Sequence, residues 1–204
     1  MVIFIFVSVL LSFFTLKYTS KVYKREKKLA IKHLEDLKNE KVTINSSVAM
    51  VSLICVLNIC IYTYYENELL ILYCLLLSIV AYTDYAAKWV PDALIFSMVA
   101  LSGITIEPEY ITCSLISIVF FTAPAIFINL IGYVRKREVW IASGDFYIIP
   151  TIAVWVEPEH AACLMLIVLM VTISISVRCK KVPMITVIYF SFMGYKLCSL
   201  LNIL

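Results

Sequence analysis

Long, uninterrupted apolar segments fill most of this chain of 204 residues, and they restrict it to one class of fold. A backbone that lies in lipid must satisfy its own hydrogen bonds, and a helix does so within a single segment. A membrane β-barrel would instead alternate apolar and polar residues over stretches of about ten residues. We therefore predict an all-α, polytopic transmembrane helical bundle. The apolar segments run over Val2–Leu16, Ser47–Tyr64, Leu69–Tyr82, Ala93–Ile106, Ile111–Tyr133, Phe146–Val156, Ala161–Val177 and Met184–Leu204.

Composition supports a membrane protein, and the segments set the number of crossings that we expect. Hydrophobic residues make up 63% of the chain and charged residues 15%, against about 45–50% and about 25% in soluble domains. The segments predict about eight crossings, although several are shorter than the roughly 20 residues that a crossing helix needs. Six crossings result if the short segments merge or re-enter the membrane. We divide the chain into residues 1–46, a membrane anchor with a basic loop, and residues 47–204, a helical membrane domain.

The loops between these segments alternate in charge, which predicts the orientation of the chain. Lys and Arg gather in residues 17–41, at Lys88, and over 135–137 and 178–181, whereas the loops between them carry glutamates and no basic residue. Because basic loops stay in the cytoplasm, we predict that both termini lie outside and that the first segment is a retained anchor. The net charge of +3 then reflects orientation and contact with anionic lipid, and it does not call for nucleic-acid binding.

Two acidic residues at the edges of apolar segments, Asp84 and Asp145, are the candidates for chemistry. An acidic residue at membrane depth costs about 3 kcal/mol and is a functional candidate by default. Both residues follow crossings that end in the cytoplasm, so the predicted topology places them on the same side. Two structural alternatives stay open. Lys88 can pair with Asp84, and Ser143 or Asp145 can cap the following helix.

The residues around the two acids predict where the next helices begin. Pro91 is expected to start a helix with Asp92 in its first turn, where the helix dipole favours an acid. Asp84 instead closes a helix, and the dipole at that end repels a carboxylate. Gly144 directly precedes Asp145 and is one of only four glycines. We expect it to allow a close approach of two backbones, or a positive φ, that brings the second acid near the first.

A pair of carboxyl groups supports one kind of chemistry in particular. Two carboxyls that share a site cannot both ionise easily, so one keeps a proton while the other acts as a base. Such a pair activates a water and protonates a leaving amide nitrogen, as in the aspartic proteases. The seven cysteines form no C-x-x-C pair, and His33 and His160 lie far apart in polar loops. We therefore predict no metal site and no nucleophile with a histidine partner.

These residues resemble the motifs of the type IV prepilin peptidases, a family of GxGD-class intramembrane aspartyl proteases. The similarity covers about residue 69 to the C-terminus. The first acid of the family stands in a D-x6-P-[DN] pattern and the second in a GxGD motif, and the last helix is entered through a proline. Here the first glycine of the GxGD motif is Ala142, and Tyr147 replaces a basic residue. The matching residues are Asp84, Pro91, Asp92, Gly144, Asp145 and Pro183.

The resemblance implies that residues 47–204 are a membrane aspartyl endopeptidase that removes the basic leader peptide from a type IV prepilin or pseudopilin. The enzyme would be a multi-pass protein of the bacterial inner (cytoplasmic) membrane, with its active site facing the cytoplasm. Larger members also methylate the new N-terminus and carry paired cysteines in a cytoplasmic loop, which the loop at 17–45 lacks. No cofactor or metal is implied, apart from S-adenosylmethionine if methylation occurs. The catalytic residues would be Asp84 and Asp145, with support from Gly144, Pro91, Asp92 and Lys88.

Two other functions fit some of the same residues. A transporter or channel would use the paired acids to bind cations or relay protons, and it predicts a polar path to the far side of the membrane. The crossings offer few polar residues for such a path. A pilus-assembly scaffold would keep the fold without catalysis, and the Ala142 departure is the observation in its favour.

Overall fold

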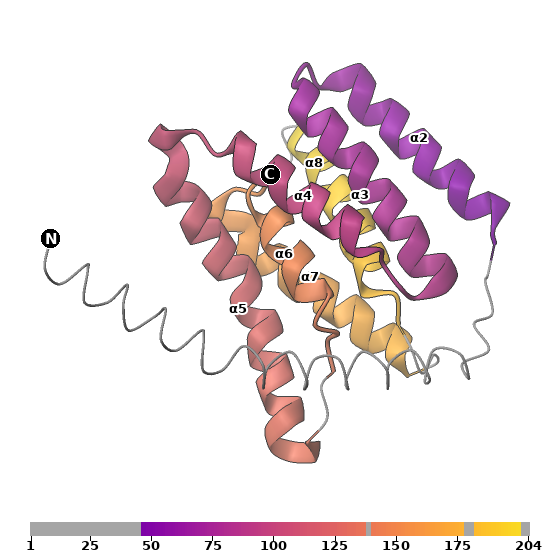
Figure 1. Cartoon of the computed structure of the whole chain (residues 1–204), viewed down its shortest axis with the longest axis vertical. Helices are drawn as coiled ribbons and strands as arrows, with labels where there is room; N and C mark the ends of the chain where they lie inside the picture. Colours follow the sequence, from indigo (N-terminus) through magenta and orange to yellow (C-terminus); the bar gives the residue numbers. More distant parts are fainter. Residues whose placement is uncertain (1–45, 138–139, 178–181, 201–204) are drawn as a thin grey trace, which may run out of the picture. The chain divides into compact units, whose positions relative to one another are not determined.

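The computed structural model describes residues 46–137, 140–177 and 182–200, and this part of the chain is helical with no strand (Figure 1). The predicted all-α class is confirmed for these residues. The predicted anchor Val2–Leu16 and nearly all of the basic loop lie outside them. The elements are α2 (Val48–Tyr64), α3 (Glu68–Ala87), α4 (Asp92–Thr105), the short 3-10 helix η1 (Pro108–Tyr110), α5 (Ile111–Lys136), α6 (Asp145–Ala153), α7 (Pro158–Ser176) and α8 (Met184–Leu200).

Each apolar segment predicted from Ser47 onward coincides with one helix. The largest difference is at α3, which was expected to end at Tyr82 and continues to Ala87. The extension follows from the alanines after Tyr85, which have high helix propensity. It places Asp84 inside the last turn of α3, at the helix end where the sequence predicted it.

The number of crossings that we predicted is not confirmed. Three helical stretches among the described residues are long and apolar enough to span a membrane, namely Glu68–Ala87, Pro108–Arg135 and Pro158–Ser176. The helices α2, α4 and α8 are apolar but shorter. The α6 helix has nine residues and is about 14 Å long, which is less than half of the hydrocarbon thickness. The three long helices support an integral membrane protein.

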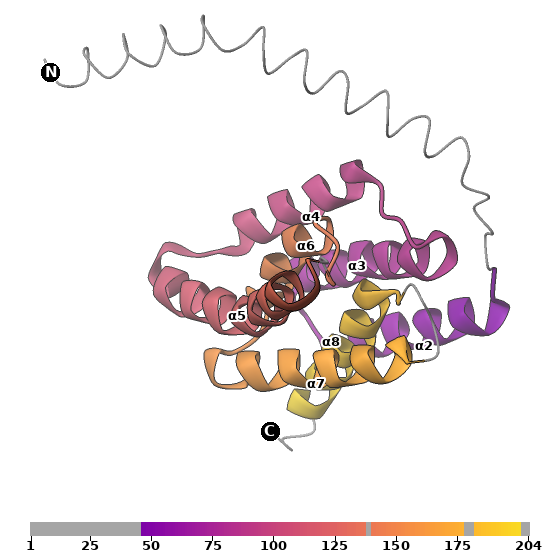
Figure 2. The same ribbon diagram turned by 90° about the horizontal axis from the view of Figure 1, so that it is seen from below.

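The helices α3 and α8 form the middle of the described bundle. The α3 helix packs against α2, α4 and α8, and α8 also packs against α2, α6 and α7. The α5 helix packs against α6 and α7, on the side away from α2 in both Figure 1 and Figure 2. Large side chains without solvent exposure fill the interior, among them Tyr73, Phe121, Tyr189 and Phe192.

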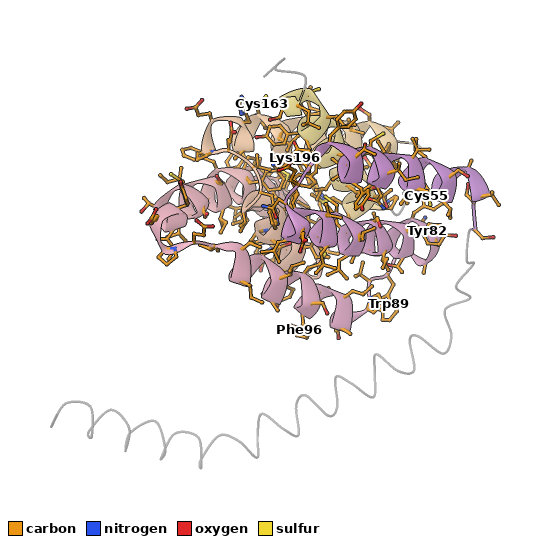
Figure 3. All side chains as sticks on the ribbon, turned by 90° about the horizontal axis from the view of Figure 1, so that it is seen from above. Cys55, Tyr82, Trp89, Phe96, Cys163 and Lys196 are labelled. Atoms are coloured by element: carbon orange, nitrogen blue, oxygen red, sulfur yellow. The ribbon has the colours of Figure 1, made fainter. Side chains whose placement is uncertain are left out.

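Apolar side chains also cover the outside of the bundle. Trp89 and Phe96 are 63% and 70% exposed and lie at the outer edge in Figure 3. Leu115, Val119 and Phe127 are likewise exposed along α5. A helix that is apolar on its outer as well as its inner face fits contact with lipid.

Candidate active site

The carboxyl group of Asp84 is buried where α3 ends and α8 begins. Only 7% of Asp84 is exposed. The backbone N–H of Thr186 donates to Oδ2 of Asp84 over 3.0 Å, and Thr186 Oγ1 lies 3.3 Å from the same oxygen. The carbonyl oxygen of Ala81, one turn before Asp84, lies 2.8 Å from the same hydroxyl and is the alternative acceptor for its single proton. The first turn of α8 therefore holds one oxygen of the carboxyl group from two directions.

Lys88 ends the α3 helix and does not form an ion pair with Asp84. Its backbone takes the left-handed conformation, with a φ of 53°, and its N–H donates to the carbonyl of Asp84 over 2.9 Å. Its side chain is exposed. Within the described part of the chain, the contact of salt-bridge length joins His160 Nδ1 and Glu157 Oε2, which are 3.4 Å apart. The alternative in which Lys88 neutralises Asp84 through a salt bridge is therefore not observed.

Asp145 occupies the first turn of α6 and is half-buried. Its N–H donates to the carbonyl of Ala142 over 3.1 Å, which closes a tight turn before the helix. The helix begins after Gly144, and no side chain caps it. The alternative in which Ser143 or Asp145 serves as a helix cap is therefore not observed either. The carboxyl group of Asp145 therefore caps no backbone N–H at the start of α6.

The backbone of Gly144 does not have the positive φ that the sequence analysis allowed for. Its φ is −61° and its ψ is −37°, the ordinary helical conformation. A Cβ at this position would lie 3.9 Å from Cδ1 of Ile95, which is an ordinary contact. The glycine therefore marks the place where α6 begins beside α4, and no backbone strain requires it.

The two acids influence each other electrostatically. Asp145 begins α6, a helix that is too short to span the membrane, and burial together with the charge of Asp84 raises the pKa of its carboxyl group to about 7. Like charges at short range oppose ionisation of the second group. Asp145 therefore holds a proton over more of the neutral pH range than an exposed carboxyl group does.

The loop that leads to Asp145 is fixed to α5. Oδ1 of Asn129 accepts hydrogen bonds from the backbone N–H groups of Trp140, over 2.9 Å, and Ile141, over 3.4 Å. The Trp140 ring lies against Gly132, where a Cβ would come within 2.8 Å of the indole. A glycine at this position of α5 is thus needed for the close approach.

A buried hydrogen-bond network fixes the far end of α6. The Tyr73 hydroxyl on α3 lies 2.9 Å from Thr151 Oγ1 on α6, and Ser102 on α4 donates to the carbonyl of Thr151 over 3.2 Å. Asp84 and Tyr73 both lie on α3, and Asp145 and Thr151 both lie on α6. This network therefore sets the position of α6 along the axis of α3.

Pro91 and Asp92 lie where the sequence predicted. Pro91 is the residue before α4, and Asp92 is in the first turn of that helix with an exposed side chain. Ile95, one turn further along, is buried and is the neighbour of Gly144 described above. Asp92 is therefore at the start of the helix beside the candidate site, without a described contact to either acid.

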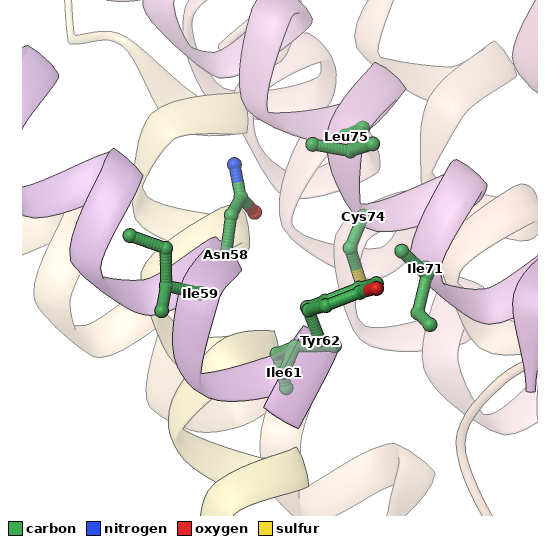
Figure 4. Close-up of a pocket in the computed structure, with 7 residues that line it drawn as sticks. All are labelled: Asn58, Ile59, Ile61, Tyr62, Ile71, Cys74 and Leu75. Atoms are coloured by element: carbon green, nitrogen blue, oxygen red, sulfur yellow. The ribbon is translucent and has the colours of Figure 1, made fainter. Parts of the chain in front are cut away.

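Metal ligands and hollows in the described ranges bear on what the two acids can do. No group of three or more His, Cys, Asp or Glu side chains in the described ranges is placed to hold a metal ion. A hollow of about 190 Å³ lies elsewhere, between α2 and α3, as Figure 4 shows. Its lining is nearly all apolar and consists of Asn58, Ile59, Ile61, Tyr62, Ile71, Cys74 and Leu75.

Sequence reasoning missed Thr186, Asn129 and the Tyr73–Thr151 contact. Thr186 had one signal, its place three residues after Pro183, which predicts a residue in the first turn of the last helix. Asn129 lies within the predicted crossing Ile111–Tyr133, where one polar residue gives no sign of its partner. No local pattern marks Tyr73, because its partner is 78 residues away.

Comparison with known proteins gives one match. A family model described as the type IV leader peptidase family matches residues 71–195, which contain both acids, Pro91, Gly144 and Thr186. No curated protein and no solved structure matches the chain.

Proposed function

The chain belongs to the type IV leader peptidase family, and we propose on that premise that it is an aspartyl endopeptidase with Asp84 and Asp145 as its catalytic pair. The observation that carries the proposal is the placement of two carboxyl groups at helix ends in one bundle, with Asp84 buried at the end of α3 against the first turn of α8 and Asp145 half-buried at the start of α6, which packs against α8. The charge of Asp84 acts on Asp145. Buried acids without a salt bridge are costly in a membrane protein and mark functional sites. The family match supports a leader peptidase in general. The aspartic mechanism is part of our proposal.

The mechanism follows from the unequal environments of the two carboxyls. Asp84, charged and held by Thr186, takes a proton from a water molecule. The water oxygen bonds to the carbonyl carbon of the scissile peptide while Asp145 donates its proton toward that carbonyl oxygen. When the intermediate collapses, the C–N bond breaks and the proton on Asp84 moves to the leaving nitrogen. As the carbonyl group forms again, the proton on the former carbonyl oxygen returns to Asp145, so both acids regain their starting protonation and the steps need no metal or cofactor.

The substrate we propose is a type IV prepilin or pseudopilin, cleaved at the cytoplasmic face of the membrane. The charge pattern of the loops supports this orientation, because Lys88 and the basic residues 135–137 flank the ends of α3 and α5 nearest the two acids in sequence. A substrate with a basic leader and an apolar helix would then have its junction at the depth of the pair. The basic loops would repel that leader, so we do not assign them to binding it.

The scaffold function remains the second candidate, because Ala142 replaces the first glycine of the family motif. Ala142 is exposed and its carbonyl accepts the hydrogen bond that forms the turn before Asp145. An alanine forms this bond as well as a glycine does. The departure therefore gives little support to an inactive protein.

Co-expression with a prepilin from the same genome tests the proposal. Asp84→Asn and Asp145→Asn should each abolish leader removal at membrane levels matched to wild type. Glu109→Gln, an exposed acid outside the site, is the control and should cleave normally. Cleavage by either Asn variant would refute the aspartyl pair, and a wild type that cleaves no prepilin would favour the scaffold.

A further inference from the structure

The start of α8 distinguishes the two oxygens of Asp84. Both contacts from Thr186 reach Oδ2, one from the backbone N–H over 3.0 Å and one from the hydroxyl over 3.3 Å. An oxygen that accepts from an N–H is a poor place for a proton. The backbone N–H of Ile185 also acts on this carboxyl group, and the two hydrogen bonds of resolved geometry among the described residues both reach Oδ2. The carboxyl of Asp145 receives no hydrogen bond from that part of the chain.

The Thr186 hydroxyl has one proton and two acceptors within reach. It lies 2.8 Å from the carbonyl of Ala81 and 3.3 Å from Asp84 Oδ2. All three groups are buried, so water does not compete for the proton. A hydroxyl in this place stabilises the charged carboxylate by turning its proton toward Oδ2, and hydrogen bonds to a charged group are the stronger kind. The N-terminal dipole of α8 acts in the same direction.

We propose that Thr186 is a positioning residue that holds Oδ2 of Asp84 and keeps this carboxyl charged, so that Oδ1 takes the proton of water and the shared proton of the resting pair stays on Asp145. The inference rests on the proposed function and assigns the roles within it. Asp84 is the base and Asp145 is the acid.

Charged groups around Asp84 leave this assignment intact. Asp145 on α6 and Lys88 after α3 act on it electrostatically. The α2 helix has no acidic or basic residue, and Asp92 on α4 is exposed. Lys196 lies three turns along α8 from Thr186. Asp145 opposes the charge of Asp84 and Lys88 favours it. The backbone N–H groups of Ile185 and Thr186 also favour the charge, and the Thr186 hydroxyl is the side-chain donor beside them.

The test is the pH profile of cleavage by the full chain reconstituted with its prepilin. Thr186→Val removes the hydroxyl and keeps the backbone N–H. Because less Asp84 is then charged at a given pH, we expect the acid limb to move to higher pH. The rate at the acid end should fall about tenfold, recover as the pH rises, and leave KM unchanged. Thr186→Ser keeps the hydroxyl and should keep the wild-type profile.

Controls separate this role from a merely structural one. Thr172→Val on α7 removes another buried hydroxyl, one without a hydrogen-bond partner in the described residues, and should change neither rate nor profile. If Thr186→Val does not accumulate, Thr186→Cys, with its weaker donor, should give a smaller shift in the same direction. A uniform loss of rate at all pH values, or an unmoved acid limb, would overturn the inference while the Asn variants of the two acids still test the proposed function itself.

Discussion

Gly132 offers the clearest test of how the bundle holds Asp145 in place. A Cβ added at residue 132 would lie 2.8 Å from Cδ2 of Trp140 and 3.0 Å from two further ring atoms. Carbon atoms in contact prefer about 3.5–4.0 Å, so the indole must move by about 0.7 Å or more. The ring cannot simply be carried away with its backbone, because Asn129 holds the N–H groups of Trp140 and Ile141.

The expected effects on stability and on activity are of different size. Gly132→Ala gains about 0.5–1 kcal/mol from the helix backbone and loses about 1–3 kcal/mol to overpacking, so the free energy of unfolding falls by at most about 2.5 kcal/mol. The effect on the cleavage rate should be larger, because the loop before Asp145 moves as well. A displacement of about 1 Å can lower the catalytic rate by about 100-fold. We expect cleavage to fall at least tenfold in a protein that still folds.

Two assays in detergent and in liposomes check this prediction. Thermal unfolding gives stability, and the rate of leader removal from a co-reconstituted prepilin gives activity. Gly194→Ala on α8 is the matched control, because a Cβ there meets nothing within 4 Å. It should keep its activity and be as stable as wild type or more so. Equal activity of the two alanine variants would refute the idea that the Gly132–Trp140 contact positions the loop.

Other perturbations test the pair and its supports. Tyr73→Phe leaves Thr151 with one fewer buried partner and should lower stability by about 1 kcal/mol, measured by thermal unfolding beside Tyr62→Phe, whose side chain is exposed. Because the pKa of Asp145 is raised to about 7 and its protonated form is the acid, cleavage should fall as the pH rises above about 7; a rate that keeps rising through pH 9 would contradict this assignment. Asp84→Asn removes a buried charge and should leave thermal stability unchanged or higher while cleavage is lost, so a large drop in stability would indicate a structural role instead. Preincubation with a chelator should leave the cleavage rate unchanged, and loss of activity that added metal restores would refute the metal-free mechanism.

Most of the helices could be predicted because lipid leaves a chain few choices. Continuous apolar runs fix the class, and prolines such as Pro91 and Pro158 mark where helices begin. The length of α6 was harder to predict from the sequence, because the apolar run continues to Val156 whereas the helix ends at Ala153. Hydropathy measures burial in protein and in lipid alike, so it could not separate a short inner helix from a crossing.

The acids could be predicted, but the contacts that set their environments could not. Asp84 and Asp145 are exceptions to an apolar pattern and stand out in the sequence. Thr186 is 102 residues from Asp84, and a threonine near the start of a helix is common. Its role depends on which oxygen it contacts, and that follows only from the packing of α8 against α3.

The arrangement of helix ends explains how an acid can be stable at the end of α3. Alone, the C-terminal dipole of α3 disfavours the carboxylate of Asp84, so the local sequence conflicts with a charged group at this position. The conflict is resolved by α8, whose first turn places the N–H of Thr186 on the same carboxyl. Asp145 has the opposite circumstances, with a favourable dipole at the start of α6 and no donor from the described residues, and burial raises its pKa. The two carboxyl groups thus have opposite local and tertiary environments, and such unequal environments are what the proposed base and acid in one site require. Local disagreement that the tertiary structure resolves is expected at functional sites, and here it occurs at the two residues proposed to carry the reaction.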